Sequence, residues 1–260
     1  MSDAVVASAP QTPSFRLDGR RALVSGAGRG LGRAAAHALA QAGAQLCLVA
    51  RSAEQIQTVR AEIEAAGGRA QALVLDVTDS AAVTRLVAEH GPFDILVNNA
   101  GTNRPAPLLE VQDADLDAIF DLNLKAAFYL AREVSRGLVA AGKPGSIINM
   151  SSQMGHVGSP RRSVYCASKH ALEGMSKALA WELGPHQIRV NTVCPTFIET
   201  PLTAPMLSEP QFRSFVLSKI ALGRLGRIEE VMGALVFLAS DASSLVTGSA
   251  LMVDGGWTAA

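Results

Sequence analysis

Tyr165, Lys169 and Ser152 have the residue types and spacing needed to move a proton. Tyr165 and Lys169 are four residues apart, so on a helix their side chains lie on one face. A free phenol has a pKa of about 10, and a neighbouring ammonium group favours the phenolate and lowers that value. Ser152 follows an apolar run and could donate a hydrogen bond to a substrate oxygen held beside the phenol. Together the three residues predict an acid/base site for an oxygen-bearing substrate.

Each of these residues also has an ordinary interpretation. A tyrosine and a lysine at this spacing are common on helix surfaces, and paired serines after a strand are common in caps and turns. Asn123 is a polar interruption between Leu122 and Leu124 in a helical stretch, and it could hold a water that links Lys169 to solvent as a proton relay. The catalytic interpretation therefore depends on what the rest of the chain brings to these residues.

A glycine-rich segment, Ser-Gly-Ala-Gly-Arg-Gly-Leu-Gly over residues 25–32, follows the first apolar run and precedes an alanine-rich helical stretch. Glycines let a backbone approach a pyrophosphate, and the start of a helix offers it free N–H groups. Leu31 stands where the strict dinucleotide fingerprint has glycine, and a tight strand-to-helix turn could also account for the run. The strand before and the helix after favour dinucleotide binding. The residues expected to contact the dinucleotide are Ser25, Gly26, Arg29, Gly30 and Leu31.

The end of the second expected strand bears on cofactor choice. A site for NAD(H) usually has Asp or Glu there, about 20 residues after the glycines, to bind the ribose 2′-hydroxyl. This chain has Arg51 and Ser52 instead, and no acid. Arg51 can pair with a 2′-phosphate, Ser52 can donate a hydrogen bond to it, and Arg29 can reach it from the glycine segment. We therefore expect NADP(H) to be favoured over NAD(H), although Arg51 could also be a solvated surface arginine.

Two further segments could line the cofactor site. Asp76 ends the third expected strand and could accept a hydrogen bond from the adenine amino group, with the Val77 backbone beside it. It could equally be a turn or helix-cap residue. Asn98, Asn99, Ala100 and Gly101 come at the end of the fourth strand, where amide and small side chains suit a wall against the cofactor ribose. A simple turn is the alternative for these four.

Short β-type runs alternate with helical stretches along the chain. Strands are expected over residues 21–25, 45–50, 70–75, 95–98, 146–150, 189–193 and 250–253. Helices are expected over residues 31–42, 53–66, 81–89, 114–141, 164–183 and 229–239. The strands are continuously apolar, which is typical of parallel strands covered on both faces. The strict alternation predicts an α/β fold with a doubly wound parallel sheet.

The chain is expected to divide into a tail and one domain. Residues 1–16 are expected to be a mobile tail, and its start carries Asp3 and no basic residue, which makes a poor secretory signal. Residues 17–260 are expected to form a single catalytic domain. Residues 196–225 break the strand–helix pattern with several prolines and a weak helix over 211–219. Such an insertion is a candidate lid over a site, or else an ordinary surface excursion.

Composition excludes several classes of protein. The 260 residues are 48% hydrophobic, which allows a large core, and 23 basic against 23 acidic residues favour neither a nucleic-acid nor a membrane partner. Cys47, Cys166 and Cys194 form no paired motif, which predicts buried thiols and a reducing, cytoplasmic compartment. No apolar run reaches the roughly 18 residues of a membrane span. The histidines show no ligand spacing, so no metal is expected.

These motifs, in this order, resemble the short-chain dehydrogenase/reductase family. They are Ser25-Gly26-x-x-x-Gly30-x-Gly32, Asn98-Asn99-Ala100-Gly101, Asn123, Ser152, Tyr165-x-x-x-Lys169 and Val253-Asp254-Gly255-Gly256. The resemblance covers residues 17–257 and implies a Rossmann-type sheet of seven strands with helices on both faces, and commonly a homotetramer. Ser25 stands where the family more often has Thr, and Pro195-Thr196 where it often has Pro-Gly.

The resemblance also implies an activity, the NAD(P)-dependent interconversion of an alcohol and a carbonyl. It implies a catalytic tetrad of Asn123, Ser152, Tyr165 and Lys169, with Tyr165 exchanging the proton on oxygen while hydride moves at carbon. Tyr165 and Lys169 are also expected beside the cofactor. Pro195, Ile198 and Thr200 match positions that contact the nicotinamide.

The loop over residues 153–163 must border the substrate if Ser152 and Tyr165 both do. It contains His156, Arg161 and Arg162, and cations there favour an anionic or polyhydroxylated small molecule such as a sugar acid. One or both arginines could instead face solvent or a subunit interface. The expected substrate contacts are Ser152, His156, Arg162 and Arg104.

Three alternative functions remain open. The resemblance is to gluconate-dehydrogenase-like and 3-oxoacyl-carrier-protein-reductase-like members, so a 3-oxoacyl-thioester reductase is the alternative within the family. A dinucleotide-sensing regulator would keep the glycine segment without the catalytic residues, and Ser152, Tyr165 and Lys169 are all present. A structural subunit of a larger enzyme would show no turnover in isolation.

Overall fold

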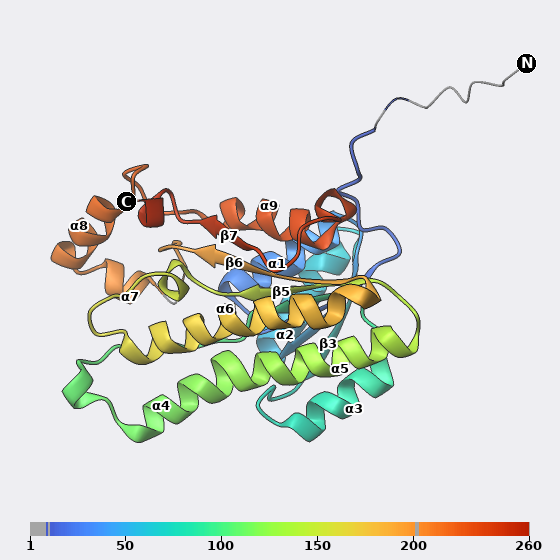
Figure 1. The fold of residues 1–260 in the computed structure, drawn as a ribbon, viewed down its shortest axis with the longest axis horizontal. Helices are drawn as coiled ribbons and strands as arrows, with labels where there is room; N and C mark the ends of the chain where they lie inside the picture. The colour runs from blue at the N-terminus through green and yellow to red at the C-terminus, as the bar shows by residue number, and fades with distance from the viewer. Residues whose placement is uncertain (1–8, 10, 201–202, 260) are drawn as a thin grey trace, which may run out of the picture.

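Seven parallel strands form one sheet in this computed structural model, which describes residues 9, 11–200 and 203–259 (Figure 1). The strands are β1 (Arg21–Ser25), β2 (Gln45–Ala50), β3 (Arg69–Val74), β4 (Ile95–Asn98), β5 (Gly145–Met150), β6 (Ile188–Pro195) and β7 (Ala250–Val253). Their order across the sheet is β3-β2-β1-β4-β5-β6-β7, with Leu23 of β1 opposite Cys47 of β2 and Leu96 of β4. The order reverses between β1 and β4, and parallel sheets bind ligands at such a point, outside the carboxyl ends of the strands.

Helices cover both faces of this sheet (Figure 1). They are α1 (Gly30–Gln41), α2 (Ala53–Ala65), α3 (Ser80–His90), α4 (Asp113–Phe120), α5 (Ala126–Ala140), α6 (Ser163–Leu183), α7 (Ala204–Leu207), α8 (Pro210–Lys219) and α9 (Ile228–Ala239). α1, α2 and α9 share a buried cluster on one face, whereas α3, α5 and α6 share another on the opposite face. The doubly wound α/β fold is therefore confirmed.

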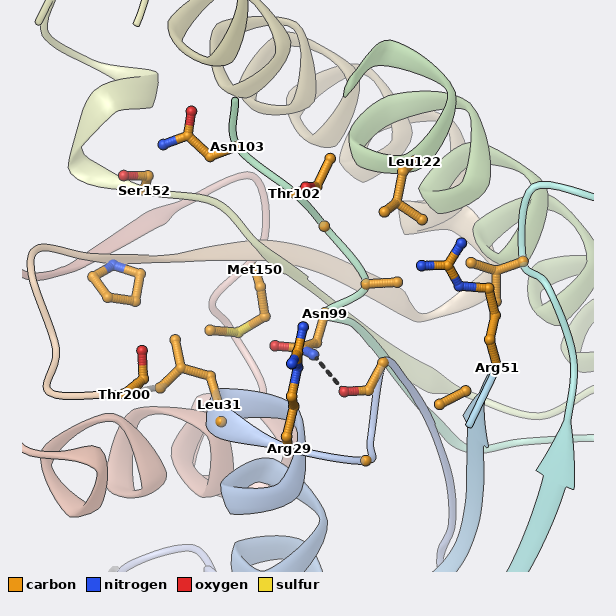
Figure 2. A pocket seen from close by; sticks show the side chains of 18 of the residues that line it. Arg29, Leu31, Arg51, Asn99, Thr102, Asn103, Leu122, Met150, Ser152 and Thr200 are labelled. Carbon is orange, nitrogen blue, oxygen red and sulfur yellow. Dashed lines mark hydrogen bonds between the residues drawn. The ribbon is translucent and has the colours of Figure 1, made fainter. Parts of the chain in front are cut away.

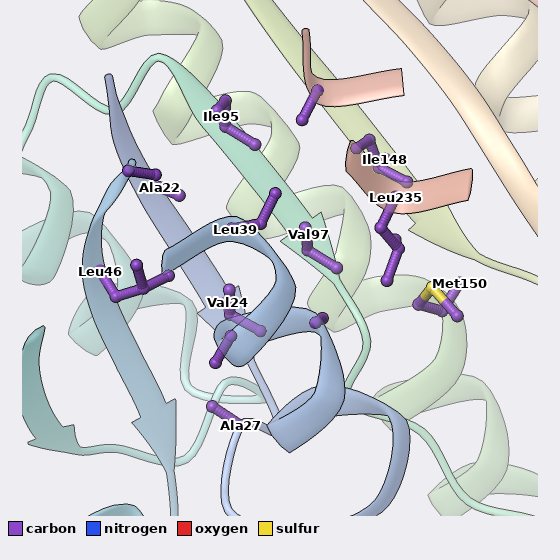
Figure 3. Close-up of a cluster of buried hydrophobic side chains, with 14 of the residues drawn as sticks. Ala22, Val24, Ala27, Leu39, Leu46, Ile95, Val97, Ile148, Met150 and Leu235 are labelled. Atoms are coloured by element: carbon purple, nitrogen blue, oxygen red, sulfur yellow. The ribbon is translucent and has the colours of Figure 1, made fainter. Parts of the chain in front are cut away.

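The core on the α1 and α9 face lies directly under the crevice. Leu39 of α1 and Leu235 of α9 are fully buried in one cluster with Val97 of β4 and Ile148 of β5 (Figure 3). Dense packing of this kind leaves little room for the strands to shift. The carboxyl ends of the central strands are therefore held in fixed positions, which a site built on them requires.

The predicted elements are found with small shifts of their ends, apart from one helix. The expected helix over 114–141 is interrupted by one turn of π-helix over Asp121–Lys125, between α4 and α5. A π turn holds one extra residue, so it turns the side chains around it to new directions. Asn123 lies in this turn, which explains the polar interruption of the apolar pattern.

The expectation that every strand is covered on both faces is wrong at the two edges of the sheet. β3 alternates between exposed and half-buried residues, and all four residues of β7 are half-buried. These strands each have one neighbour only, so less of the protein covers them. Their apolar residues reflect strand propensity as much as burial.

The segment over residues 196–225 packs around a small core of its own. It contains α7 and α8, and the predicted helix over 211–219 corresponds to α8; residues 201 and 202 lie outside the described residues. The ring of Phe197 lies 5.6 Å from that of Phe212 and 5.8 Å from that of Trp257, measured between centroids. Met154 and Cys166, from the segments around Ser152 and Tyr165, belong to the same cluster. The insertion is thus attached to the expected active site.

The N-terminal segment is in contact with the domain before residue 17. Residues 1–8 and 10 of the expected tail lie outside the described residues. The Phe15 ring lies 6.3 Å from that of Phe237 on α9, and Arg16 donates to the carbonyl oxygen of Gln41 at 3.2 Å. All three cysteines are buried and free, and no described helix is long and apolar enough to cross a membrane.

Candidate active site

The glycine segment forms a tight turn at the crevice between β1 and β4. Gly26 and Gly30 have φ angles of 64° and 55°, in the left-handed region that favours glycine. A Cβ on Gly32 would lie 2.1 Å from the carbonyl oxygen of Gly26. The glycine segment and the first helical turn of α1 are therefore packed backbone against backbone. The N-cap residue Arg29 makes no side-chain capping bond. The first N–H groups of α1 are therefore available to a ligand.

A cavity of about 490 Å³ opens above this turn and runs along the carboxyl ends of the strands (Figure 2). The residues that were predicted from the sequence and that line it are Gly26, Arg29, Gly30, Leu31, Arg51, Ser52, Asp76, Val77, Asn99, Ala100, Gly101, Ser152, Tyr165, Lys169, Pro195, Ile198 and Thr200. Arg51 lies at one side of the cavity in Figure 2, and Ser152 and Asn103 lie at the other. Residues from both halves of the chain thus meet in one site.

The wall of the cavity suits a nicotinamide dinucleotide. Neither Arg29 nor Arg51 forms an ion pair with any residue that the structure describes, so both cations are available to phosphate groups. Ser151 Oγ and Thr196 Oγ1 are buried at the other end and have no hydrogen-bond partner among the described residues. Unpaired polar atoms of this kind are costly, and a polar ligand that bonds them removes the cost. The residues present therefore fit the cofactor.

Two predicted cofactor residues lie behind the cavity wall. Ser25 Oγ accepts hydrogen bonds from the N–H groups of Asn99 and Ala100, at 3.0 and 3.1 Å. Asn98 donates to Asn149 Oδ1 at 2.8 Å and so ties β4 to β5. Asn99, expected in the same wall as Asn98, lines the cavity (Figure 2) and donates to the carbonyl oxygens of Ser25 and Gly26. The alternation of side chains along β4 could have separated the two asparagines.

Other lining residues escaped the sequence analysis. They are Gly28, Val49, Ala50, Gln55, Leu75, Thr102, Asn103, Leu122, Met150, Ser151, Thr196 and Thr203. Most of them are neighbours of predicted residues. The sequence therefore located the strand ends at the cavity, but it did not identify which side chains at those ends line it. Asp76 lines the cavity, as a contact with the adenine requires. Its Oδ1 also accepts from Thr78 Oγ1 at 2.7 Å, as expected of a turn residue.

Tyr165 and Lys169 lie one turn apart on α6, as their spacing predicts. The Lys169 ammonium donates to the carbonyl oxygen of Met150 at 2.7 Å and lies 5.6 Å from the centroid of the Tyr165 ring. Burial raises the pKa of Tyr165 to about 12, while Ser152 and Arg162 oppose that rise. Burial also lowers the pKa of Lys169 to about 8. The phenol is thus a weaker acid than its spacing from lysine predicts, because burying a phenolate is costly.

Ser152 lies beside the phenol at the end of β5, where its hydroxyl helps to hold a short turn. Its Oγ accepts from the N–H of Met154 at 3.1 Å and donates to Oε1 of Gln153 at 2.7 Å. Gln153 is itself buried, and its Nε2 has no partner among the described residues. A substrate oxygen that receives the Ser152 hydrogen bond must therefore compete with the Gln153 amide.

Asn123 lies in the interior with its side-chain amide hydrogen-bonded. Its Oδ1 accepts from the N–H of Thr102 at 2.8 Å, and its Nδ2 donates to the carbonyl oxygen of Thr102 and to Ser168 Oγ, at 3.0 and 3.1 Å. The amide therefore joins the π turn, the loop after β4 and α6. It does not line the cavity, so its contribution to the site is the placement of these three segments.

The three residues predicted to bind substrate, beyond Ser152, have different surroundings. Arg104 pairs through Nη1 with Asp115 on α4 and its side chain is 48% exposed, so its substrate contact stays a prediction. His156 lies against Glu173 and Cys194 behind the cavity wall. Arg162 is 6% exposed, and its Nη2 lies 2.9 Å from the sulfur of Met206 in α7. None of the three lines the cavity, and Arg162 is the one whose charge acts on the Tyr165 phenol, where it opposes the rise of the pKa that burial causes.

Comparison with known proteins identifies the family. The family model for enoyl-(acyl carrier protein) reductases matches residues 26–258. The chain belongs to the short-chain dehydrogenase/reductase family. L-Xylulose reductase of Bos taurus is 42% identical to this short-chain dehydrogenase/reductase over 245 residues, which are 94% of this chain and 99% of the relative. The 3-oxoacyl-[acyl-carrier-protein] reductase of Thermotoga maritima is 40% identical over 246 residues, 93% of this chain and 99% of the relative.

Solved structures agree with this assignment. A gluconate 5-dehydrogenase from Burkholderia cenocepacia J2315, in complex with NADP and tartrate, matches with a TM-score of 0.90 and 37% identity over 95% of this chain and 98% of that chain. This short-chain dehydrogenase/reductase is an oxidoreductase that acts on CH–OH donors with a nicotinamide dinucleotide. The sequence identities to these three proteins, 42%, 40% and 37%, are too similar to indicate which of their substrates this chain uses.

The glycine turn provides a test of the close backbone packing. Gly32→Ala would place a methyl group against the Gly26 carbonyl oxygen and should lower the free energy of unfolding by about 2 kcal/mol or more. The control is Gly137→Ala in α5, where the new Cβ would meet only ordinary contacts at 3.7 Å and helix propensity favours alanine by about 0.5–1 kcal/mol. Denaturant unfolding measures both, and equal stability of the two variants would contradict the packing argument.

Proposed function

We propose that this enzyme is an NADP(H)-preferring dehydrogenase/reductase that interconverts a secondary alcohol and a ketone on a sugar acid or related hydroxy acid. The observation that carries the substrate class is the buried Arg162 guanidinium, whose Nη1 has no partner among the described residues. Its nearest polarisable neighbour is a thioether and not a carboxylate. A buried cation without a counter-ion is unfavourable, and a substrate carboxylate supplies the missing charge.

Proton transfer is assigned to three side chains. Tyr165 gives its phenolic proton to the substrate oxygen in reduction and takes it back in oxidation. Ser152 releases Gln153 and donates its hydrogen bond to that same oxygen, which stabilises the charge that develops there. Lys169 leaves the Met150 carbonyl for the cofactor ribose, and its positive charge favours the phenolate. A nicotinamide ring bound in the cavity supplies or accepts the hydride.

Asn123 completes the set as a positioning residue. Nδ2 donates to Thr102 and Ser168, and Oδ1 accepts from Thr102, which leaves one lone pair of Oδ1 unused. Asn123 therefore holds the π turn against α6, and the remaining lone pair is the acceptor for a relay water that links Lys169 to solvent.

The phenol of Tyr165 has a matched control in the chain's only other tyrosine, Tyr129. Tyr165→Phe should lower kcat by about 100- to 10,000-fold, because the proton donor is lost, while cofactor binding and the melting temperature stay close to the parent. Tyr129 lies on α5 under the Arg132 guanidinium and does not line the cavity, so Tyr129→Phe should keep kcat. NAD(P)H absorbance gives kcat, and unchanged turnover in a folded Tyr165→Phe enzyme would refute the assignment.

The preference for NADP(H) is supported by the charges around the end of β2. Arg51 lines the cavity there. Hydrogen bonds from Thr78 lower the pKa of Asp76, the nearby acid at the end of β3, and the charge of Arg51 adds a smaller lowering effect. Ser52 caps α2 and also lines the cavity. A 2′-phosphate would accept hydrogen bonds from Arg51 and Ser52, and an acid in their place would repel it.

A charge reversal tests this cofactor preference. Arg51→Asp should lower kcat/KM with NADPH by about 10- to 100-fold, the value of one or two charge-assisted hydrogen bonds, and leave kcat/KM with NADH unchanged or higher. Arg85→Asp, on the exposed side of α3 away from the cavity, is the control. Steady-state kinetics with both cofactors decide the question, and a parent enzyme that prefers NADH would exclude the proposal.

A neutral replacement of Arg162 tests the substrate class. Arg162→Met should raise KM for a sugar acid by about 10- to 100-fold and leave KM for a neutral ketose of the same length unchanged. Arg161→Met, at the exposed neighbouring position, should change neither value. Equal effects on the acid and the ketose would mean that Arg162 is structural. Turnover of a 3-oxoacyl thioester above that of every sugar acid would favour the alternative that the Thermotoga maritima relative represents.

The insertion over residues 196–225 serves as the substrate lid. It lines the cavity through Thr196, Ile198 and Thr200, and α7 places Met206 against the Arg162 guanidinium. Its own buried cluster gives it internal cohesion, so it can move as a unit. Closure over a bound acid would exclude water from the phenol and from the carboxylate anchor together.

The assembly is a homotetramer in this proposal, and the compartment is the cytoplasm. Exposed apolar side chains on α4, α5 and α6 support assembly: Leu116 is 40% exposed, Phe128 42% and Trp181 87%. The half-buried edge strand β7 offers a second surface to a neighbouring subunit. Three free thiols are consistent with a reducing environment.

A further inference from the structure

Three side chains of different types meet behind the wall of the cavity. His156 follows a short 3-10 turn after β5, Glu173 lies on α6 and Cys194 lies near the end of β6. His156 Nε2 is 3.4 Å from Glu173 Oε1, Cys194 Sγ is 3.3 Å from the same oxygen, and His156 Nε2 is 3.6 Å from Cys194 Sγ. A nitrogen, an oxygen and a sulfur thus form a triangle with nearly equal sides.

The size of this triangle matches the face of a zinc coordination tetrahedron. Zinc binds histidine nitrogen and carboxylate oxygen at about 2.0–2.2 Å and thiolate sulfur at about 2.3 Å, which places such ligand atoms about 3.3–3.6 Å apart. An N–H···O hydrogen bond is usually shorter, about 2.7–3.2 Å. The His156–Glu173 contact, at 3.4 Å, lies outside that range and inside the range for two ligands of one ion.

The surroundings also suit a bound cation. Glu173 is 5% exposed and Cys194 0%, and Thr192 Oγ1 donates to Glu173 Oε2 at 3.0 Å, which orients the carboxylate. The Ser151 hydroxyl lies beside the Cys194 sulfur, so an oxygen is available as the fourth ligand. The His156 side chain is 25% exposed, and it provides a path from solvent.

We propose that His156, Glu173 and Cys194 form a binding site for a divalent ion of the zinc type. The ligands are a neutral imidazole, a carboxylate and a thiolate, with Ser151 or a water in the fourth position. When the ion binds, the S–H bond of Cys194 breaks, a metal–sulfur bond forms and the proton passes to solvent. No electron is transferred, and the proposal does not depend on the substrate class or on the cofactor.

The role of the ion follows from the segments that it joins. His156 follows Ser152 on one loop, Glu173 is one helical turn after Lys169 on α6, and Cys194 precedes Pro195 at the end of β6. The ion would therefore connect the three segments that carry the catalytic wall. His156, Glu173 and Cys194 do not line the cavity, and among the named ligands only Ser151 does, so the ion lies behind the cavity wall as a structural site.

Cobalt substitution tests the site on the tag-free, full-length enzyme. After dialysis against a chelator, Co²⁺ is added and the absorption spectrum is recorded, because a thiolate ligand gives a charge-transfer band and tetrahedral geometry gives strong visible bands. We expect one ion per chain with a dissociation constant below about 1 µM, displaced by Zn²⁺, and a higher melting temperature in Zn²⁺. Absence of the charge-transfer band would overturn the proposal and leave a buried hydrogen-bond cluster.

Matched variants identify the ligands. Cys194→Ser should remove the charge-transfer band, and His156→Gln should weaken Co²⁺ binding at least tenfold. The controls are Cys47→Ser, a buried thiol on β2, and His170→Gln, an exposed imidazole on α6 one residue after Lys169. Both controls should keep the band and the stoichiometry. A band that survives in Cys194→Ser, or is lost in Cys47→Ser, would place the ion elsewhere and refute this site; circular dichroism of each variant confirms that it is folded.

Discussion

The buried Lys169 ammonium is the constraint on which the active site depends. It lies in the interior, no carboxylate of the described residues is at ion-pair distance from it, and the carbonyl oxygen of Met150 accepts its hydrogen bond. This bond fixes α6 against the end of β5, and because Tyr165 and Ser152 lie on these two elements, it also fixes the phenol relative to the serine. Burial lowers the pKa of Lys169 to about 8, so the position is costly unless a polar group from the cavity shares the charge.

The parallel sheet provides the second condition, a common edge for residues that are far apart in sequence. The crevice between β1 and β4 receives the glycine turn, and the ends of β5 and β6 receive Ser152 and Pro195. Polar side chains inside the sheet hold these ends in register, as the Asn98–Asn149 bond between β4 and β5 illustrates. The same buried bond explains why an asparagine in a cofactor motif serves the scaffold. Its neighbour Asn99 lines the cavity and holds the glycine turn through the carbonyl oxygen of Ser25.

Local patterns predicted the elements and the strand ends, whereas tertiary partners decided the individual side chains. β1, β2, β4 and β7 have the bounds that their apolar runs predict. Arg104 pairs with Asp115, 11 residues later, and no spacing rule gives that pairing. His156 and Cys194 are 38 residues apart, and only the packing of the loop on β6 brings them together. The π turn at Asn123 could not be predicted either. The sequence shows one polar residue in an otherwise apolar helical pattern, and this does not distinguish a π turn from a continuous α-helix.

The hydrophobic cluster around Phe197 and Val216 packs the segment that would recognise the substrate, whereas the sheet and α6 carry the reacting groups. Its members come mainly from the proline-rich excursion, and it touches the catalytic framework only at a few points such as Met154 and Cys166. Substitutions inside this cluster can reshape the entrance to the active site without altering the strands, within the limit that Tyr165 packs against the cluster and must keep its position. A fold organised in this way can acquire new substrates by altering one small, semi-independent hydrophobic unit while its reaction stays the same.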